Sequence, residues 1–189
     1  MTLLEKALID LSKILFEKHI RYMVIGGMAN AVWGNPRATI DVDVTVWVQD
    51  KKIEYTTQIF AEEFDVLVPN PIEFIKETRV LPLRTLDGVQ LDIIFGSLPY
   101  EEEAIHRAVN VSISGTLVRF CTPEDLILHK IISNRNKDVT DACGIVKKRL
   151  KNLDLAYLDP RIRELANIIE RPEIWKFWTQ WKKAAENQQ

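Results

Sequence analysis

The chain has 189 residues and a formal net charge of -2, and 47% of its residues are hydrophobic and 28% charged. This composition is ordinary for a globular protein able to bury a core, and it excludes a low-complexity chain. The near-neutral charge argues against strong non-specific binding of nucleic acid by the whole chain, while a local basic patch stays open.

The two cysteines and the N-terminal segment indicate the cellular compartment of the protein. Neither Cys121 nor Cys143 has a neighbouring Cys or His at metal-ligand spacing, which predicts two ordinary reduced thiols. Residues 1–19 are amphipathic and carry acidic residues, unlike a signal peptide. No stretch approaches the roughly 20 apolar residues of a membrane span. We therefore expect a cytoplasmic protein with no membrane association.

The first two thirds of the chain predict mixed helices and strands. Thr2 and Glu5 fit a capping box for a first helix that reaches about Glu17. Asp87-Gly88, between two apolar runs, is a strong signal for a β-hairpin. The other elements expected up to residue 121 are strands at 22–25, 39–48 and 66–68, helices at 28–33, 52–64, 71–74 and 100–108, hairpin arms at 80–86 and 89–95, and a second hairpin that pairs 110–113 with 116–121.

The last third predicts helices throughout. Thr122-Pro123-Glu124-Asp125 combines an N-cap residue, a proline at the first helical position and acidic residues in the first turn. Helices are expected at about 123–135, 137–150, 159–170 and 172–186. The fold class is therefore α+β: a core over residues 1–121 with a mixed β-sheet and flanking helices, then a helical C-terminal part over residues 122–189.

A Gly-Gly turn lies at the centre of the core. The apolar run 22–25 leads directly into Gly26-Gly27, and a short helix follows until Gly34-Asn35-Pro36 ends it. Two adjacent glycines let the backbone turn sharply and approach a ligand closely, because no Cβ is in the way. The first amide groups of such a helix lack intrahelical partners, so they can face a phosphate.

The strand that follows carries two aspartates on one face. Apolar and mainly polar residues alternate from Thr39 to Val48, so Asp41 and Asp43 point the same way, with Cα atoms roughly 6.5–7 Å apart. Two oxygen ligands at this spacing suit Mg²⁺. The alternative is a strand with one solvated face, or one whose charges protect a sheet edge.

Asp92 is a third candidate. It lies in the second hairpin arm between Leu91 and Ile93, where a charge is costly unless it is paired or bound to a metal. A salt bridge to a residue such as Arg84 is the competing interpretation.

The order Gly-Gly, short helix, Arg37-x-Thr39-x-Asp41-x-Asp43 resembles the nucleotidyltransferase superfamily that includes DNA polymerase β. Within it, the pattern is most similar to small bacterial AbiEii-like enzymes of the toxin or defence type. Those proteins also have a Pro-Glu-Asp-Leu segment, a lysine, an arginine and a basic-Asp-x-x-Asp pair. Matching residues are present here at 123–126, Lys130, Arg135 and 137–141.

By residue type alone, Asp138 and Asp141 share one face of a helix, and a solvated charged face is the simpler interpretation. The resemblance implies a different role: Lys130 would touch the nucleotide or its triphosphate, and Arg135, Asp138 and Asp141 would support it. Arg37 would neutralise phosphate charge, although an ion pair with Asp41 or Asp43 is an alternative.

The resemblance implies transfer of a nucleoside monophosphate from an NTP, such as ATP, to an acceptor hydroxyl on a tRNA, a protein or a small molecule. Asp41, Asp43 and Asp92 would hold Mg²⁺ or Mn²⁺, and Lys130 would join them as a catalytic residue. The residues implied in nucleotide binding are Gly26, Gly27, Arg37, Thr39 and Lys130. A toxin–antitoxin setting with an antitoxin-type protein partner is also implied.

Two other functions compete with this one. A metal-dependent nuclease would use the same carboxylates, but the Gly-Gly turn favours a triphosphate. A non-catalytic nucleotide-binding or partner-binding module would keep the fold without turnover.

The last predicted helix is rich in aromatic residues. Ile174, Trp178 and Trp181 form one helical stripe, and Trp175 and Phe177 fall beside it. We expect the stripe to pack onto the body of the protein, and at least one of the three tryptophans to stay partly exposed and to border an acceptor or partner site.

Overall fold

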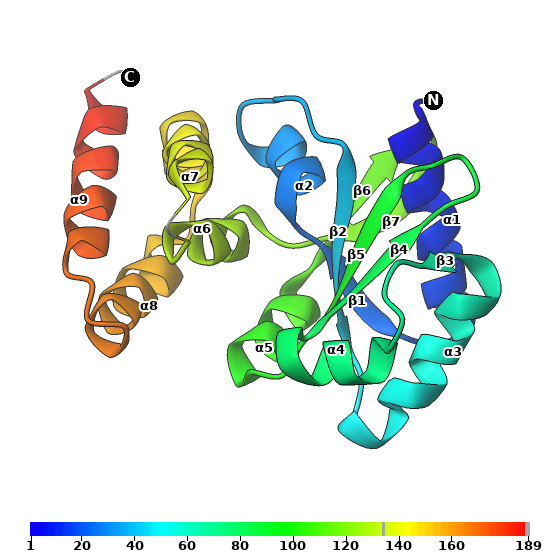
Figure 1. The fold of residues 1–189 in the computed structure, drawn as a ribbon. Coiled ribbons are helices and arrows are strands. Elements are labelled where there is room, and N and C mark those ends of the chain that lie inside the picture. The colour runs from blue at the N-terminus through cyan, green and yellow to red at the C-terminus, as the bar shows by residue number, and fades with distance from the viewer. Residues whose placement is uncertain (134, 188–189) are drawn as a thin grey trace. The chain divides into compact units, whose positions relative to one another are not determined.

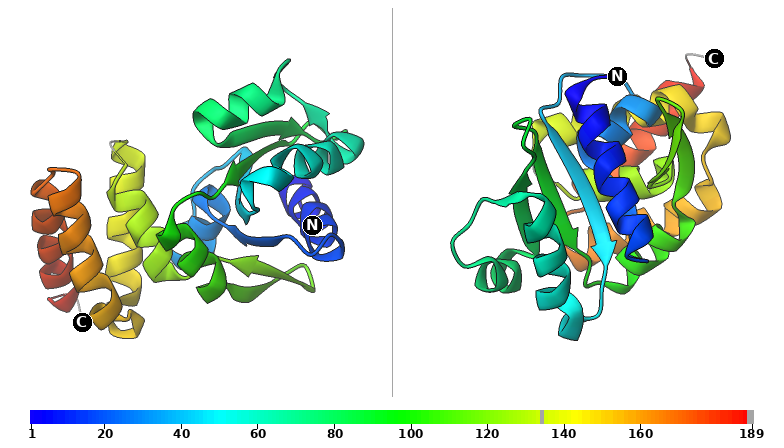
Figure 2. Two further views of the ribbon diagram at one scale, coloured as in Figure 1. Left: turned by 90° about the horizontal axis from the view of Figure 1, so that it is seen from below. Right: turned by 90° about the vertical axis from the view of Figure 1, so that its right-hand side faces the viewer.

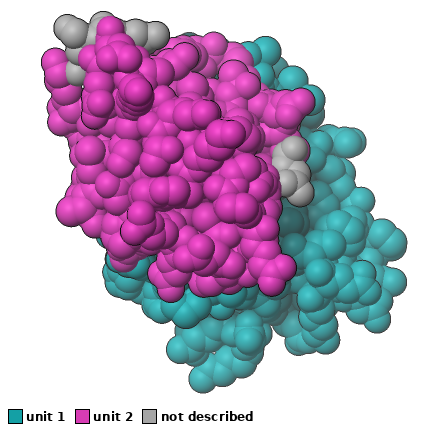
Figure 3. Space-filling view, turned by 90° about the vertical axis from the view of Figure 1, so that its left-hand side faces the viewer, with its two compact units in different colours: residues 1–28, 38–121 teal, residues 29–37, 122–189 magenta. Residues whose placement is uncertain are grey.

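The structure, a computed structural model, describes residues 1–133 and 135–187. It forms two compact units, coloured in Figure 3: residues 1–28 with 38–121, and residues 29–37 with 122–189. The segment 29–37, which is expected in the core, thus groups with the second unit. The division into two domains at residue 121 stays a prediction.

The first unit is built on one mixed sheet, which has seven strands in the described residues (Figure 1). The strand order is β3-β4-β5-β2-β1-β7-β6. The β2–β5 and β1–β7 pairs are parallel, and the other pairs are antiparallel. The strands are β1 (Arg21–Val24), β2 (Asp41–Trp47), β3 (Asp65–Val66), β4 (Val80–Arg84), β5 (Gln90–Phe95), β6 (Val109–Ile113) and β7 (Thr116–Phe120).

The alternation in β2 is as the sequence predicts. Val42, Val44 and Val46 are fully buried, while Asp41 and Asp43 on the other face are partly exposed. Both predicted hairpins are confirmed, as β4–β5 and β6–β7. The apolar face of the sheet therefore belongs to the core, and the face that carries the aspartates is accessible.

Helix α1 covers the apolar face of the sheet (Figure 2) by packing on β1, β2 and β7. Its capping box is present: the Thr2 hydroxyl accepts a hydrogen bond from the Glu5 amide, and Glu5 accepts one from the Thr2 amide. Leu8, Leu11 and Leu15 are fully buried, and each contributes about 1.5–3 kcal/mol of transfer free energy. The elements of this unit are α1 (Leu3–Glu17), η1 (Asp50–Lys52), α3 (Ile53–Glu63), α4 (Pro71–Thr78) and α5 (Pro99–Arg107).

The second unit is helical. It contains residues 29–33 of α2, the helix that begins in the first unit. Helix α8 starts four residues earlier than expected because Asp154 caps it by accepting a hydrogen bond from the Tyr157 amide. Pro160, which would lie in the first turn of a helix beginning at residue 159, thus lies inside the helix. The elements are α2 (Gly26–Trp33), α6 (Pro123–Ile131), α7 (Asn136–Arg149), η2 (Leu150–Asn152), α8 (Leu155–Ile168) and α9 (Glu173–Glu186).

The aromatic stripe of α9 packs as predicted. Ile174 and Trp178 are fully buried, and Trp181 is 9% exposed. The Trp178 indole N–H donates to Asp159 Oδ1 at 2.6 Å. Trp175 is partly exposed, with the Arg163 guanidinium 4.6 Å from its ring centre. One tryptophan is therefore accessible, as expected, and its contact with an acceptor or partner stays a prediction.

The α+β fold class is confirmed, with a mixed sheet, flanking helices and a helical C-terminal part. Within the described residues, no helix combines the length and the apolar character needed to cross a bilayer.

Candidate active site

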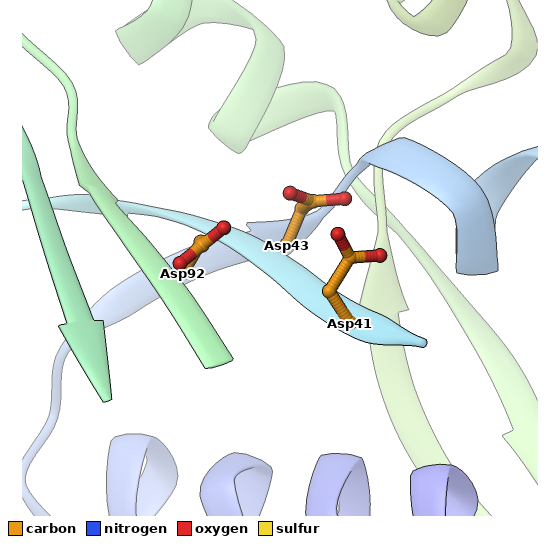
Figure 4. A group of neighbouring side chains, drawn as sticks. All are labelled: Asp41, Asp43 and Asp92. Atoms are coloured by element: carbon orange, nitrogen blue, oxygen red, sulfur yellow. The ribbon is translucent and has the colours of Figure 1, made fainter. Parts of the chain in front are cut away.

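Three carboxylates meet at one end of the β2–β5 pair. Asp41 and Asp43 lie two residues apart on β2, and Asp92 on β5 is the direct register partner of Asp43. One carboxylate oxygen of each residue lies within 4.8 Å of the others, and all three residues are partly exposed. Figure 4 shows their side chains rising from the same face of the sheet, on the side away from α1.

Two polar side chains orient this carboxylate cluster. The Thr39 hydroxyl donates to Asp41 Oδ1 at 2.8 Å. The Gln90 amide donates to Asp92 Oδ1 at 3.1 Å. The described residues contain no ion pair between Asp92 and Arg84, so the salt bridge that competes with a functional role for Asp92 is not formed. Asp41 and Asp92, the two outer aspartates of the cluster, are thus each held by a residue two positions earlier in the chain.

The two glycines are required by the carboxylate cluster itself. Gly26 has a positive φ of 64°, and a Cβ at this position would fall 1.8 Å from Asp43 Oδ2. A Cβ on Gly27 would fall 2.3 Å from the Thr39 hydroxyl oxygen. The turn therefore needs glycine both for its backbone conformation and for the space that Asp43 and Thr39 occupy. Helix α2 begins at Gly26 itself, two residues earlier than expected.

The donor set suits a hard divalent cation. Three carboxylates supply only oxygen ligands, which Mg²⁺ and Mn²⁺ prefer over nitrogen or sulfur. Their oxygens converge within 4.8 Å and remain partly exposed to solvent. Like charges this close repel one another, so cation binding relieves the repulsion. The residues present fit a metal site.

A second cluster, the lysine network, lies within the second unit. The Lys130 ammonium donates to Asp138 Oδ1 at 2.9 Å and to Asp141 Oδ2 at 2.8 Å. Arg37 Nε lies 3.1 Å from Asp141 Oδ2, and Arg135 Nε lies 2.6 Å from Asp138 Oδ2. Three cations therefore share two carboxylates.

The lysine network is buried. Lys130 is 4% exposed, Asp138 is 3% exposed and Asp141 is 7% exposed. The interpretation of Asp138 and Asp141 as a solvated charged face is therefore wrong. Burial alone would raise the pKa of Asp138, but the hydrogen bond and charge of Lys130, with hydrogen bonds from Ser133 and Arg135, hold this pKa below its ordinary value.

The ion-pair partner of Arg37 differs from the one that the sequence suggests. The sequence allows an ion pair with Asp41 or Asp43, whereas the structure pairs its guanidinium with Asp141, at 3.0 Å between Arg37 Nη2 and Asp141 Oδ2. Local sequence patterns do not reveal this partner, because Asp141 lies on α7, 104 residues further along the chain. Arg37 is thus a member of the lysine network, and its side chain remains 33% exposed.

The predicted site residues form two clusters, and the members of each cluster contact one another. Asp41, Asp43 and Asp92 form the carboxylate cluster with Thr39, Gly26 and Gly27. The lysine network contains Arg37, Lys130, Arg135, Asp138 and Asp141. The structure adds three polar residues that bind carboxylates of these clusters and that no sequence motif marks: Gln90, Ser133 and Asn30. Gln90 has a sequence signal, since it shares a strand face with Asp92.

Comparison with solved structures identifies similar folds. An antigenic nucleotidyltransferase-like protein from Paracoccidioides brasiliensis has 20% identity and a TM-score of 0.54, covering 92% of this chain and 91% of that chain. The antibiotic-resistance factor ANT(2'')-Ia has 15% identity and a TM-score of 0.57, covering 89% and 95%. The lincosamide antibiotic adenylyltransferase LnuA has 12% identity and a TM-score of 0.52, covering 75% and 95%. At these identities the likeness shows the fold.

The family follows from a comparison of sequences. No curated protein sequence matches the chain significantly. Residues 4–189 match the family described as nucleotidyltransferase of unknown function (DUF6036), so the chain belongs to this family and is an enzyme of the nucleotidyltransferase class.

Proposed function

We propose that the protein transfers a nucleoside monophosphate from an NTP to an acceptor hydroxyl, with a divalent metal ion held by Asp41, Asp43 and Asp92. The observation that carries this proposal is the convergence of three partly exposed carboxylates from β2 and β5. Membership of a nucleotidyltransferase family supports it, because the reacting groups of this chemistry are phosphates that need a cationic counterpart.

Mg²⁺ or Mn²⁺, when bound, would supply Lewis-acid stabilisation of the attacking and leaving oxygens. The chain's own residues have distinct tasks around it. Thr39 and Gln90 fix the outer aspartates through their hydrogen bonds of 2.8 and 3.1 Å. Gly26 and Gly27 leave room for Asp43 and Thr39, and the first amides of α2, which lack intrahelical partners, would donate to a phosphate oxygen.

The reaction itself is a displacement at the α-phosphorus. The acceptor oxygen forms a bond to this phosphorus, the bond to the bridging oxygen breaks, and pyrophosphate leaves. The hydroxyl proton is assigned to Asp92, the aspartate on the neighbouring strand. Its partial exposure lets it accept a proton and pass it to solvent.

The lysine network has a supporting role in this proposal. Direct contact of Lys130 with the triphosphate is what the family resemblance predicts. The burial of Lys130 and its two carboxylate partners favour a positioning role instead, in which it holds α6 and α7 together. Nucleotide binding by Arg37 stays a prediction, since its side chain is 33% exposed but pairs with Asp141.

Only the names of the structurally similar proteins bear on the class of acceptor molecule. LnuA is named a lincosamide antibiotic adenylyltransferase and has lincomycin bound, and ANT(2'')-Ia is named an antibiotic-resistance factor. These names support a small molecule as the acceptor, beside the tRNA and protein acceptors that AbiEii-like proteins suggest. ATP as the donor, the AbiEii-like toxin or defence setting, and an antitoxin-type partner remain predictions.

The test uses purified protein with Mg²⁺ and each of the four NTPs labelled at the α-phosphate, added to cell extract. Nucleotidyl transfer predicts a labelled acceptor and released pyrophosphate. A nuclease would instead shorten added RNA or DNA without consuming NTP, and a binding module would bind NTP without releasing pyrophosphate.

A further inference from the structure

A cavity of about 300 Å³ opens in the first unit, lined by residues from the end of α1, the end of β2 and the first turns of α3. Its wall includes Trp47, at the end of β2. Trp47 follows Asp43 by four residues along this strand, which corresponds to about 13 Å. The cavity is therefore at the end of β2 away from the carboxylate cluster, and its volume suits a ligand the size of a mononucleotide.

The charge of the cavity is opposite to that of the chain. Lys18, Arg21 and Lys52 line it together with a single carboxylate, Glu102, whereas the whole chain carries a net charge of -2. Arg21 is already paired, with Glu102 at 2.9 Å. Within the described residues, Lys18 and Lys52 form no ion pair, so their ammonium groups are available to an anion.

The cavity also offers an aromatic wall and a polar contact. Tyr55 lines it and is 64% exposed, which leaves a large aromatic surface open to a ligand. Thr56 lines it too and is only 2% exposed, yet its hydroxyl makes no hydrogen bond to any described residue. A hydroxyl with no partner in the described residues is available to a polar group of a ligand in the cavity.

We propose that this cavity, the Lys18–Lys52 pocket, is a second binding site that takes a nucleoside monophosphate. The two unpaired lysines, one from the end of α1 and one from η1, hold the phosphate. The aromatic face of Tyr55 or Trp47 stacks on the base, an arrangement that tolerates any base because every base has a π-face. The Thr56 hydroxyl meets a polar group of the ligand. The pocket acts independently of the carboxylate cluster and requires no metal.

The test is a titration of the whole protein with each of the four ribonucleoside 5′-monophosphates in EDTA, so that metal-dependent binding at the carboxylate cluster is removed. Inorganic phosphate and the four nucleosides are titrated separately, to test the phosphate and the base alone. The readout is the indole N–H signal of Trp47 in a ¹H–¹⁵N spectrum, assigned with the Trp47→Phe variant. The other four tryptophans serve as internal references.

We expect the Trp47 signal to shift with saturation for a nucleoside monophosphate, and to shift less with phosphate or nucleoside alone. The Lys18→Gln/Lys52→Gln double variant should weaken binding about tenfold, as two exposed charge contacts are lost. The matched variant Lys13→Gln/Lys76→Gln removes two exposed lysines that do not line the cavity and should bind normally.

Asp43→Asn should also bind normally, which separates this proposal from the nucleotidyl-transfer proposal. Equal weakening in both double-lysine variants would overturn the pocket, because it would show only a general charge effect. Absence of any saturable shift at Trp47 with all four nucleotides would overturn it as well.

Discussion

Asp43 on β2 lies directly opposite Asp92 on β5, in a parallel strand pair. This register carries the carboxylate cluster, because side chains alternate between the two faces of a sheet. A slip of one residue would turn Asp92 toward the buried face that Leu91 and Ile93 now occupy. The apolar residues that fix the register of β5 therefore also fix the position of the third carboxylate.

Gly26→Ala should inactivate the protein through Asp43. The added Cβ would fall 1.8 Å from Asp43 Oδ2, and moving a reacting group by about 1 Å costs up to about 10²-fold in rate. The positive φ adds a stability cost of about 1–2 kcal/mol. Gly88→Ala is the matched control: Gly88 also has a positive φ, but nothing lies within 4 Å of the new Cβ. It should lose similar stability and keep its activity, which urea unfolding and labelling rates together will show.

Thr39→Val should weaken metal binding while leaving the fold intact. It removes the hydroxyl that holds Asp41 at 2.8 Å, and loss of such a partner typically costs about 10–100-fold in metal affinity. Thr45→Val, on the strand β2 that also carries Asp41 and Asp43, removes a buried hydroxyl that has no hydrogen-bond partner among the described residues. It should leave metal affinity unchanged and should not lower stability. Calorimetric titration with Mn²⁺ measures both affinities, and equal values for the two variants would contradict the role of Thr39.

Lys130→Met should destabilise the protein by up to about 3–5 kcal/mol, since two buried carboxylates lose the ammonium that they share and keep only their pairs with Arg37 and Arg135. A solvated Lys130 would instead predict a stability change of no more than about 0.5 kcal/mol. Lys137→Met, an exposed lysine on the same helix as Asp138, should change stability by no more than about 0.5 kcal/mol. Urea unfolding at neutral pH distinguishes the two. If Lys130→Met stays folded with an unchanged KM for NTP, direct phosphate contact by Lys130 is ruled out.

The lysine network also predicts a pH dependence. The pKa of Asp138 is lowered in the folded protein relative to 3.8, so the unfolded chain takes up this proton first as pH falls. The stability that Asp138 contributes is thus complete above its unfolded pKa and is lost as pH falls below about 4, through the folded pKa. Asp138→Asn should flatten the fall in stability below about pH 5, and Asp10→Asn, on α1 with a side chain that is 49% exposed, serves as the control. Parallel curves for all three proteins would contradict this assignment.

Local features of this fold are predictable from the sequence, and long-range partners are not. The Thr2–Glu5 cap, the Asp87-Gly88 hairpin and the alternation of β2 each depend on residues a few positions apart, so periodicity and turn chemistry reveal them. The pairing of Arg37 with Asp141 depends on the packing of distant segments, which no local pattern encodes. The same holds for the burial of Lys130, because a lysine near two aspartates in sequence is typical of a solvated surface.

The glycine pair shows most clearly what the sequence alone does not predict. The sequence predicts that Gly26 and Gly27 form a turn that admits a ligand, but the atoms that need the space are those of Asp43 and Thr39. Only the fold places the start of α2 beside β2. The sequence therefore predicts the carboxylate cluster. Only the structure shows that glycine is needed at both positions to leave room for Asp43 and Thr39.

The most direct test of metal-dependent nucleotidyl transfer is the labelling of cell extract with Mg²⁺ and α-labelled NTPs, comparing wild type, Asp43→Asn and Asp65→Asn. Asp65 is an exposed aspartate on β3, outside the carboxylate cluster. We predict a labelled acceptor and pyrophosphate release for wild type and Asp65→Asn, and a loss of at least about 10²-fold for Asp43→Asn with an unchanged melting curve. Undiminished labelling by a folded Asp43→Asn protein would contradict the assignment of the carboxylate cluster as the metal site.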